Sequence, residues 1–161
     1  MAIRKARLSD ISKIQVLLEQ ILSVHHAVRP DIFQKTGSKY TNEELEDILR
    51  DEKQMIYLYE DNSQKILGRL FLMLQNPSSN VMKSHKILFI NYLCVDESAR
   101  GQNIGEKLYH FAREKAFELG CYHLTLTFWA ANQGAVRFYE RMGMLPQEIR
   151  METILTADEK E

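Results

Sequence analysis

The sequence predicts a single α/β domain of the α+β type, with elements in the order β-α-α-β-β-β-α-β-α-β. Three observations support this prediction. Apolar residues near the N-terminus recur at helical spacing, and the middle of the chain holds several β-like runs separated by polar turns. Farther on, over residues 95–108, an apolar strand enters a Gly-containing turn that opens an amphipathic helix. At 161 residues the chain fits one domain, predicted over residues 1–156, and residues 157–161 are expected to be a frayed tail.

The N-terminal half is predicted to contain a short strand, two helices and a hairpin. Ser9 and Asp10 precede an apolar pattern at helical spacing, so they are expected to cap the first helix. Residues 41–44, Thr-Asn-Glu-Glu, form a capping box for the second helix. The composition of residues 61–64 predicts a hairpin turn, and Gly68 is expected to mark a bulge. The elements are a strand at 3–6, a helix at 11–22, a helix following Thr41, and strands at 55–60 and 66–75.

The C-terminal half is predicted to alternate between strands and helices. Gly120 and Gly143 are placed where glycine ends a helix. From Leu124 onward apolar residues alternate with threonines, which indicates a strand. The elements are a strand at 87–95, a helix at 103–119, a strand at 124–129, a helix at 133–142 and a closing strand at 151–155.

The composition favours an ordinary globular protein. With a net charge of -1, the chain gives no electrostatic reason to expect a nucleic acid or membrane partner. The basic N-terminus lacks the apolar stretch of a secretory signal, and the longest apolar run, residues 87–95, is too short to span a bilayer, so a cytoplasmic location is expected. Cys94 and Cys121 lack the spacing of a metal site or redox pair and are interpreted as reduced structural thiols.

The turn at residues 95–108 has the features of an anion site. A strand that runs into such a turn and then a helix leaves several backbone N–H groups unpaired at the positive end of the helix dipole. Gly101, Asn103 and Gly105 are residue types that tolerate unusual backbone angles there, and Arg100 adds a positive charge. A phosphate would fit this arrangement.

A second segment, residues 132–144, makes the indication specific. Together with the turn it resembles the GCN5-related N-acetyltransferases, whose pattern is (Gln/Arg)-x-x-Gly-x-(Gly/Ala) after a strand, then Asn-x-x-Ala-x-x-Phe-Tyr-x-x-x-Gly. Asn103 stands where the family has its first glycine, and Asn is the least costly other residue for a left-handed backbone. The predicted order of elements is also that of the family's fold, a mixed central sheet flanked by helices. The residues in register are Arg100, Gly105, Asn132, Ala135, Phe138, Tyr139 and Gly143.

The resemblance implies transfer of an acetyl group from acetyl-CoA, as co-substrate, to a primary amine, by direct attack in a ternary complex and without a metal. It places the pyrophosphate against the backbone amides of the turn. The backbone of Leu93 would polarise the acetyl carbonyl and that of Val95 would pair with the pantetheine arm. Family members often have Ser or Thr in place of Glu106, whose carboxylate is expected to point away from a phosphate. The residues expected to bind the co-substrate are Leu93, Cys94, Val95, Arg100, Gly101, Gln102, Asn103, Ile104, Gly105, Glu106, Asn132, Ala135, Phe138 and Tyr139.

Tyr139 is the best candidate for a catalytic side chain, with Leu93 acting through its backbone. A phenol can donate a proton to a departing thiolate, although a tyrosine beside Phe138 on an amphipathic helix is also a common core residue. Asn132 can bond the co-substrate or cap the last helix, and the two roles are compatible.

The general base is not identified by the sequence. Many family members carry a Glu on the strand equivalent to residues 87–95, and this strand has no carboxylate. A water relay, an amine that arrives neutral, or a side chain from the segment between the first two helices would have to serve. The candidates for the acceptor side, each with a structural alternative, are His25, His26, Asp31, Asn91 and Trp129.

Two other functions stay open at this stage. A non-catalytic acyl-CoA-binding module would keep the turn without turnover, and the missing carboxylate favours it. A nucleotide-binding βα unit is disfavoured, because the Gly spacing and downstream acidic residue of the dinucleotide fingerprint are missing. The acceptor, a small molecule or a protein amine, is not specified, and the closing strand is expected to offer an edge for a homodimer.

Overall fold

A five-stranded mixed sheet forms the centre of the molecule, as the α+β prediction requires. The structure is a computed structural model that describes residues 2–156. Neighbouring strands are antiparallel except β4 and β5, which are parallel. In spatial order the strands are β1 (Ala2–Lys5), β2 (Gln54–Glu60), β3 (Ile66–Gln75), β4 (Ile87–Val95) and β5 (His123–Leu126).

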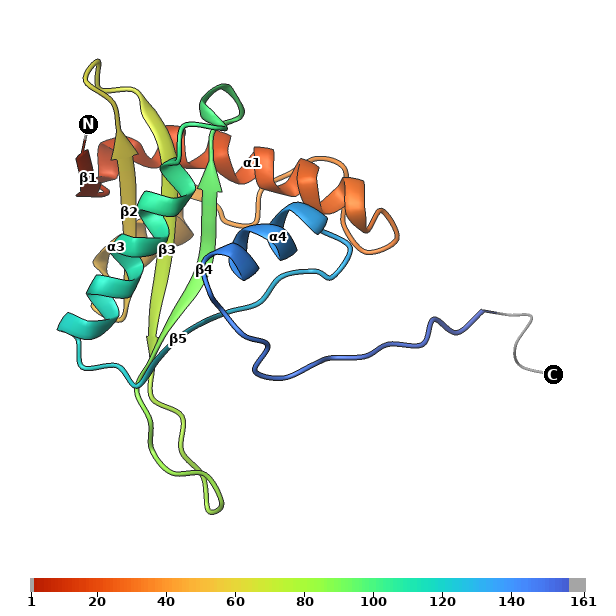
Figure 1. The fold of residues 1–161 in the computed structure, drawn as a ribbon. Coiled ribbons are helices and arrows are strands. Elements are labelled where there is room, and N and C mark those ends of the chain that lie inside the picture. The colour runs from red at the N-terminus through yellow and green to blue at the C-terminus, as the bar shows by residue number, and fades with distance from the viewer. Residues whose placement is uncertain (1, 157–161) are drawn as a thin grey trace.

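Helices cover both faces of this sheet and create two apolar cores. Helix α3 lies on one face and α1 on the other (Figure 1). The α3 core contains Leu72, Leu88 and Leu108, and the core under α1 and α2 contains Ile14 and Leu58, all fully buried or nearly so. The helices are α1 (Ile11–Val28), α2 (Asn42–Arg50), α3 (Ile104–Glu118) and α4 (Gln133–Arg141), with short 3-10 turns at Leu8–Asp10 and Glu97–Ala99.

Most predicted element ends are confirmed by local geometry, but the helix predicted at 11–22 continues to Val28, so His25 and His26 lie on α1 and not in the connection after it. The Thr41 hydroxyl accepts the N–H of Glu44 at 3.1 Å, as a capping residue should. Gly120 and Gly143 adopt φ of 69° and 85° just after α3 and α4. Asp10 is the N-cap residue of α1, as predicted, but its carboxylate makes no cap bond to the helix and instead binds the Arg4 guanidinium at 2.9 and 3.0 Å.

The bulge that Gly68 was predicted to mark is present, but its extra residue is the neighbour of Gly68, which itself has a packing role. The register shift between β2 and β3 leaves Leu67, its neighbour, as the extra residue. A Cβ on Gly68 would lie 2.9 Å from Leu108 Cδ1 and 3.0 Å from Ile104 Cγ2. Glycine is therefore needed here so that the first turns of α3 can pack closely on β3.

The predicted closing strand at residues 151–155 is wrong for this chain. Residues 145–156 run away from the body of the molecule (Figure 1) and make no backbone hydrogen bond to any described residue. Their alternating pattern suits an extended backbone, but a strand forms only where a neighbouring strand supplies the ladder. The tail predicted at residues 157–161 lies outside the described residues.

Candidate active site at the β4–α3 turn and the end of β4

The turn between β4 and α3 presents a run of unpaired backbone donors. Gly101 has φ of 84°, and Asn103 has φ of 60° and ψ of 20°, the left-handed conformation predicted for it. The first helical bond of α3 runs from the N–H of Lys107 to the carbonyl of Asn103 at 3.1 Å. Within residues 2–156, nothing accepts a hydrogen bond from the N–H groups of residues 101–106. These six donors at a helix N-terminus form a cradle for an anion.

Side chains around the cradle leave it open and positive. Arg100 is exposed and has no acidic partner among the described residues. Glu106 turns along the helix toward His110, with its Oε1 3.6 Å from the ring Nε2, so its carboxylate points away from the cradle as expected. A Cβ on Gly105 would lie 3.4 Å from the Phe138 ring, which leaves little space between α3 and α4 at this point.

Beyond Ile90, strands β4 and β5 separate. Their parallel pairing joins Ile87–Ile90 to His123–Leu126 and then stops. On the other side, β3 pairs with β4 through Phe71–Tyr92 and Leu72–Ile90, so Asn91 is the extra residue of a bulge. Residues 92–95 therefore have a strand neighbour on the β3 side alone. The backbone of Leu93, predicted to polarise a carbonyl, lies in this opened stretch together with Cys94 and Val95.

Helix α4 lies next to the cradle and the opened strand. The Asn132 side-chain oxygen accepts the N–H of Ala135 at 3.1 Å, which makes Asn132 the N-cap of α4 and leaves its amide NH₂ without a partner among the described residues. Phe138 packs against the α3 core beside Gly105. The motif residues of α4 and of the turn are thus brought together.

Tyr139 lies on α4 and is partly buried near Cys94 in the opened part of β4. Its ring stacks on Phe128 with centroids 5.7 Å apart and an interplanar angle of 12°. Burial raises the pKa of the phenol well above its usual value, and the neighbouring Cys94 and Tyr109 raise it further. Tyr139 therefore stays protonated and can only donate a hydrogen bond or a proton over the working pH range.

Of the three titratable candidates on the acceptor side, His25 is free to accept a proton, whereas His26 and Asp31 already have hydrogen-bond or ion-pair partners. His25 is half-buried, and its ring lies 4.8 Å from that of Phe33. Burial lowers the pKa of His25, and Lys39 lowers it further, so the imidazole is neutral near pH 7. His26 is different, because its Nδ1 lies 2.9 Å from the carbonyl of Phe33. Asp31 is an exposed carboxylate bound by Arg29 at 2.9 and 2.8 Å, which lowers its pKa.

Trp129 belongs to the same group of rings as His25. The Phe33 ring meets it edge-on at 5.5 Å, and the Arg29 guanidinium lies 5.2 Å from the Trp129 centroid. Trp129 thus joins the segment after β5 to the end of α1. Asn91, by contrast, enters the site through the backbone bulge described above.

Sequence reasoning missed several residues on this side. Lys39 lies with its Nζ 4.9 Å from the Tyr92 ring, and Arg29 and Phe33 make the contacts given above. None of these residues belongs to a motif or to a periodic pattern. Their proximity depends on how the segment between α1 and α2 crosses the end of β4, which a local pattern does not encode.

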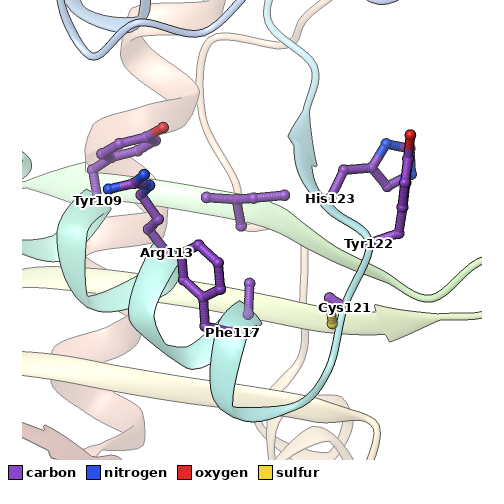
Figure 2. A pocket seen from close by; sticks show the side chains of 8 residues that line it. Tyr109, Arg113, Phe117, Cys121, Tyr122 and His123 are labelled. Atoms are coloured by element: carbon purple, nitrogen blue, oxygen red, sulfur yellow. The ribbon is translucent and has the colours of Figure 1, made fainter.

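Other features of the structure lie away from this site or add nothing to it. A cavity of about 150 Å³ opens between the last turns of α3 and the start of β5 (Figure 2). Its lining runs along α3 from Tyr109 to Phe117, about 8 to 20 Å from the start of the helix at a rise of about 1.5 Å per residue. Among residues 2–156, no three His, Cys, Asp or Glu side chains are grouped so as to hold a metal ion. None of the helices described is long and apolar enough to cross a membrane.

Comparison with known proteins agrees with the geometry. The acetyltransferase (GNAT) family profile matches residues 19–144. A mutant of the BH1408 protein from Bacillus halodurans is 27% identical, with a TM-score of 0.92 over 97% of this chain and 100% of that one. Glucosamine-6-phosphate N-acetyltransferase from Arabidopsis thaliana is 25% identical, with a TM-score of 0.68 over 96% and 98% of the two chains. A Trypanosoma brucei acetyltransferase is 22% identical, with a TM-score of 0.69 over 96% and 99%, a likeness of fold. With its profile match, mixed sheet and opened β4, the chain belongs to the GNAT family of acetyltransferases.

Proposed function

We propose that this chain transfers an acetyl group from acetyl-CoA to a primary amine by direct attack within a ternary complex. The observation that carries the proposal is the juxtaposition of three features within one site. Six unpaired N–H groups form the cradle, the backbone of β4 is free on its β5 side, and a protonated Tyr139 lies beside Cys94. Each of these meets one requirement of thioester aminolysis.

The cradle fits the pyrophosphate of the co-substrate. Unpaired N–H groups and Arg100 offer directional donors and charge, which are what a phosphate needs at a helix N-terminus. The Asn132 amide and the backbone of Val95 are proposed to bind the pantetheine arm, which would follow the opened edge of β4. The thioester would then lie next to Leu93.

In the chemical step, the neutral amine attacks the carbonyl carbon and the carbonyl π electrons move to oxygen. The N–H of Leu93 is proposed to stabilise that oxyanion. When the carbonyl re-forms, the C–S bond breaks and the thiolate accepts a proton from Tyr139, while the proton lost by the amine nitrogen returns the phenol to its neutral form. The burial that raises the pKa of Tyr139 raises that of a thiol leaving group as well, so the two acids stay matched.

His25 is the proposed group for deprotonating an ammonium acceptor. It is the one candidate of the three whose side chain is neutral and not engaged by an ion pair or a backbone carbonyl. Its place beside Phe33 and near Lys39, whose Nζ lies 4.9 Å from the Tyr92 ring of β4, would let it serve in place of the carboxylate that β4 lacks.

A non-catalytic acyl-CoA-binding module is the second candidate function. The observation that favours it is the absence of Asp and Glu from β4. The two candidates differ in turnover and agree in co-substrate binding, so a rate assay separates them. Release of free CoA thiol that depends on an added amine supports the enzyme, whereas binding without release across a broad amine panel supports the module.

Calorimetric titration with acetyl-CoA, CoA and NAD tests the binding half of the proposal. We expect binding of both CoA species, abolished by Gly105→Glu, which places bulk and negative charge in the cradle. Arg100→Ala is expected to weaken binding by roughly 10-fold or more, the effect of losing one charge-assisted contact. Ser12→Glu, the same side chain on the exposed start of α1, is the matched control and should bind normally.

Two results would contradict this proposal. Failure of the native chain to bind either CoA species would mean that the cradle does not hold a pyrophosphate. A preference for NAD over CoA would instead support a nucleotide-binding βα unit.

A further inference from the structure

Two positively charged side chains lie against Tyr92 of β4, on the sheet face that α1 covers. The Lys39 Nζ lies 4.9 Å from the centroid of the Tyr92 ring, and the Arg69 guanidinium lies 5.3 Å from the same centroid. Neither side chain forms an ion pair with an Asp or Glu within residues 2–156. Tyr92 directly precedes Leu93, so this charge lies near the backbone that is proposed to hold the thioester.

Arg69 is fully buried, which makes its lack of a counter-ion unusual. Its Nη1 donates to the carbonyl of Ile14 at 3.4 Å and its Nη2 lies 3.1 Å from the Cys94 sulfur, while its Nε has no partner among the described residues. A buried charge is ordinarily paired, because removing an ion from water is costly. In a buried environment the charge is also screened less than at the surface. Arg69 therefore adds a positive field at the end of β4.

The other arginine on the acceptor side shows the contrast. The Arg29 guanidinium binds the carboxylates of Asp31 and Glu152, at 2.8 and 2.7 Å. Two acidic groups thus neutralise Arg29, whereas β4 offers no Asp or Glu to Lys39 and Arg69. The uncompensated positive charge on this side is concentrated at Tyr92.

This field acts on any amine that approaches the thioester. Lys39 already lowers the pKa of His25, because two positive charges at this place repel one another. An ammonium acceptor without other charges would meet the same repulsion. A negative group on the acceptor would reverse it, since Lys39 is exposed and its ammonium offers three donors to a bound anion.

We propose that the acceptor is a small primary amine that also carries an anionic group, a carboxylate or a phosphate, and that Lys39 binds this group. Arg69 touches no ligand and supports the site through its charge. Tyr92 and Leu93 are one residue apart along β4, a rise of about 3.3 Å, so one small molecule can reach both Lys39 and the thioester. The inference rests on the proposed acetyl transfer, whose donor and chemistry it leaves unchanged.

Initial rates of thiol release with matched pairs of amines test this inference. β-Alanine against β-alaninamide tests a carboxylate, and phosphoethanolamine against ethanolamine tests a phosphate. We expect the anionic member of at least one pair to have a kcat/KM higher by roughly 10-fold or more, the effect of one charge-assisted contact. The pair with the larger ratio identifies the anionic group.

Substitutions of Lys39 assign the preference to this residue. Lys39→Gln should bring the ratio within the preferred pair close to one, chiefly by raising KM for the anionic amine, while acetyl-CoA still binds at the cradle. Lys39→Arg keeps the charge and should keep most of the preference. Lys35→Gln is the matched control, because Lys35 is an exposed lysine of the same segment with no ion pair or ring contact among residues 2–156, and it should behave as the native chain.

The outcomes separate this inference from acetyl transfer itself. Equal use of both members of each pair overturns the inference and leaves acetyl transfer standing. A preference that survives Lys39→Gln overturns it too, since another group would then hold the anion. If no amine releases thiol, acetyl transfer fails, and titration of the CoA complex with β-alanine and phosphoethanolamine by calorimetry decides the rest. Binding that Lys39→Gln abolishes would support the anion site, and absence of binding would remove it.

Discussion

Tyr139 is the residue for which the structure and the proposed chemistry make the most direct prediction. Tyr139→Phe removes one oxygen and keeps the ring that stacks on Phe128. We expect kcat to fall by roughly 100-fold, the effect of a lost general acid, with KM for acetyl-CoA and Tm unchanged. Initial rates of thiol release measure this.

Tyr122→Phe, an exposed tyrosine at the start of β5, is the control and should keep the native rate. The pH profile gives a second readout. Because the pKa of Tyr139 is raised by burial, the native enzyme should show no loss of rate from phenol ionisation up to about pH 10, the unperturbed value for tyrosine. A native rate in Tyr139→Phe would remove the proton-donor role.

For His25 we expect activity to be lost at low pH, whereas ionisation of Tyr139 would affect the rate only at high pH. Burial and Lys39 lower its pKa, so the neutral, proton-accepting imidazole predominates at pH 7 and is lost as the pH falls through that lowered value. His25→Gln should reduce kcat/KM at pH 7 by roughly 10- to 100-fold. The loss should shrink at high pH, where the amine arrives already deprotonated.

His26→Gln is the comparison, because His26 contacts the carbonyl of Phe33 and faces the same segment. It should change kcat/KM little at any pH. If the two variants lose activity equally, and equally at all pH values, the histidines support the loop and neither acts as a base.

Among the secondary-structure elements, the position of α3 depends on the space that Gly68 leaves on β3. Gly68→Ala places a methyl group 2.9 Å from Leu108 and 3.0 Å from Ile104, so these buried side chains, or the start of α3 with them, must shift. Overpacking of this kind costs about 1–3 kcal/mol of unfolding free energy. Because the shift occurs at the helix start, acetyl-CoA affinity should fall too. Urea unfolding and calorimetry measure the two effects.

Gly134→Ala is the matched substitution on α4. Its new Cβ would meet only the Asn132 side-chain oxygen at 3.6 Å, an ordinary contact, and Ala favours the helix. Stability should rise by about 0.5–1 kcal/mol or stay unchanged. Equal effects of the two alanines would contradict a close approach of α3 to β3 at Gly68.

Among the secondary-structure elements, sequence patterns predicted those features that depend on a residue's own backbone conformation. The left-handed Asn103, the glycines that end α3 and α4, and the Thr41 cap all follow from local steric and hydrogen-bonding preferences. The strand predicted at residues 151–155 failed because alternation describes a segment and says nothing of its partner. The predicted strand from Leu124 ended early, at Leu126, where β5 parts from β4.

For the molecule as a whole, sequence patterns could not predict which residues meet on the acceptor side. Trp129 lies far along the chain from His25 and Phe33, and topology alone brings it to them. The bulge at Asn91 depends on the register between β3 and β4, which no single strand encodes. The cradle of backbone donors was predictable because these donors are contiguous in sequence.

The ion cluster of Arg4, Asp10 and Glu60 joins β1, the start of α1 and β2, and it makes a prediction for global stability. Asp10 is 4% exposed and accepts two guanidinium bonds and the N–H of Arg7. Asp10→Asn should lower the unfolding free energy at pH 7 by about 2 kcal/mol, the typical value of bonds to a charged group. For a chain of this size Tm should fall by about 4–8 °C. Asp47→Asn, on the exposed face of α2, should change it by less than about 0.5 kcal/mol.

The pH dependence of this difference identifies the carboxylate as its cause. The Arg4 guanidinium holds the pKa of Asp10 below its usual range, so the folded state favours the ionised form. The unfolded chain binds a proton near pH 3.9, and the stabilising contribution is present above that value and is lost as the pH falls through the lower, folded pKa. Urea unfolding of both proteins should therefore give a constant difference from pH 7 to about 5 and a shrinking one below about pH 4. A difference that persists unchanged into acid would assign the loss to packing of the amide and not to charge.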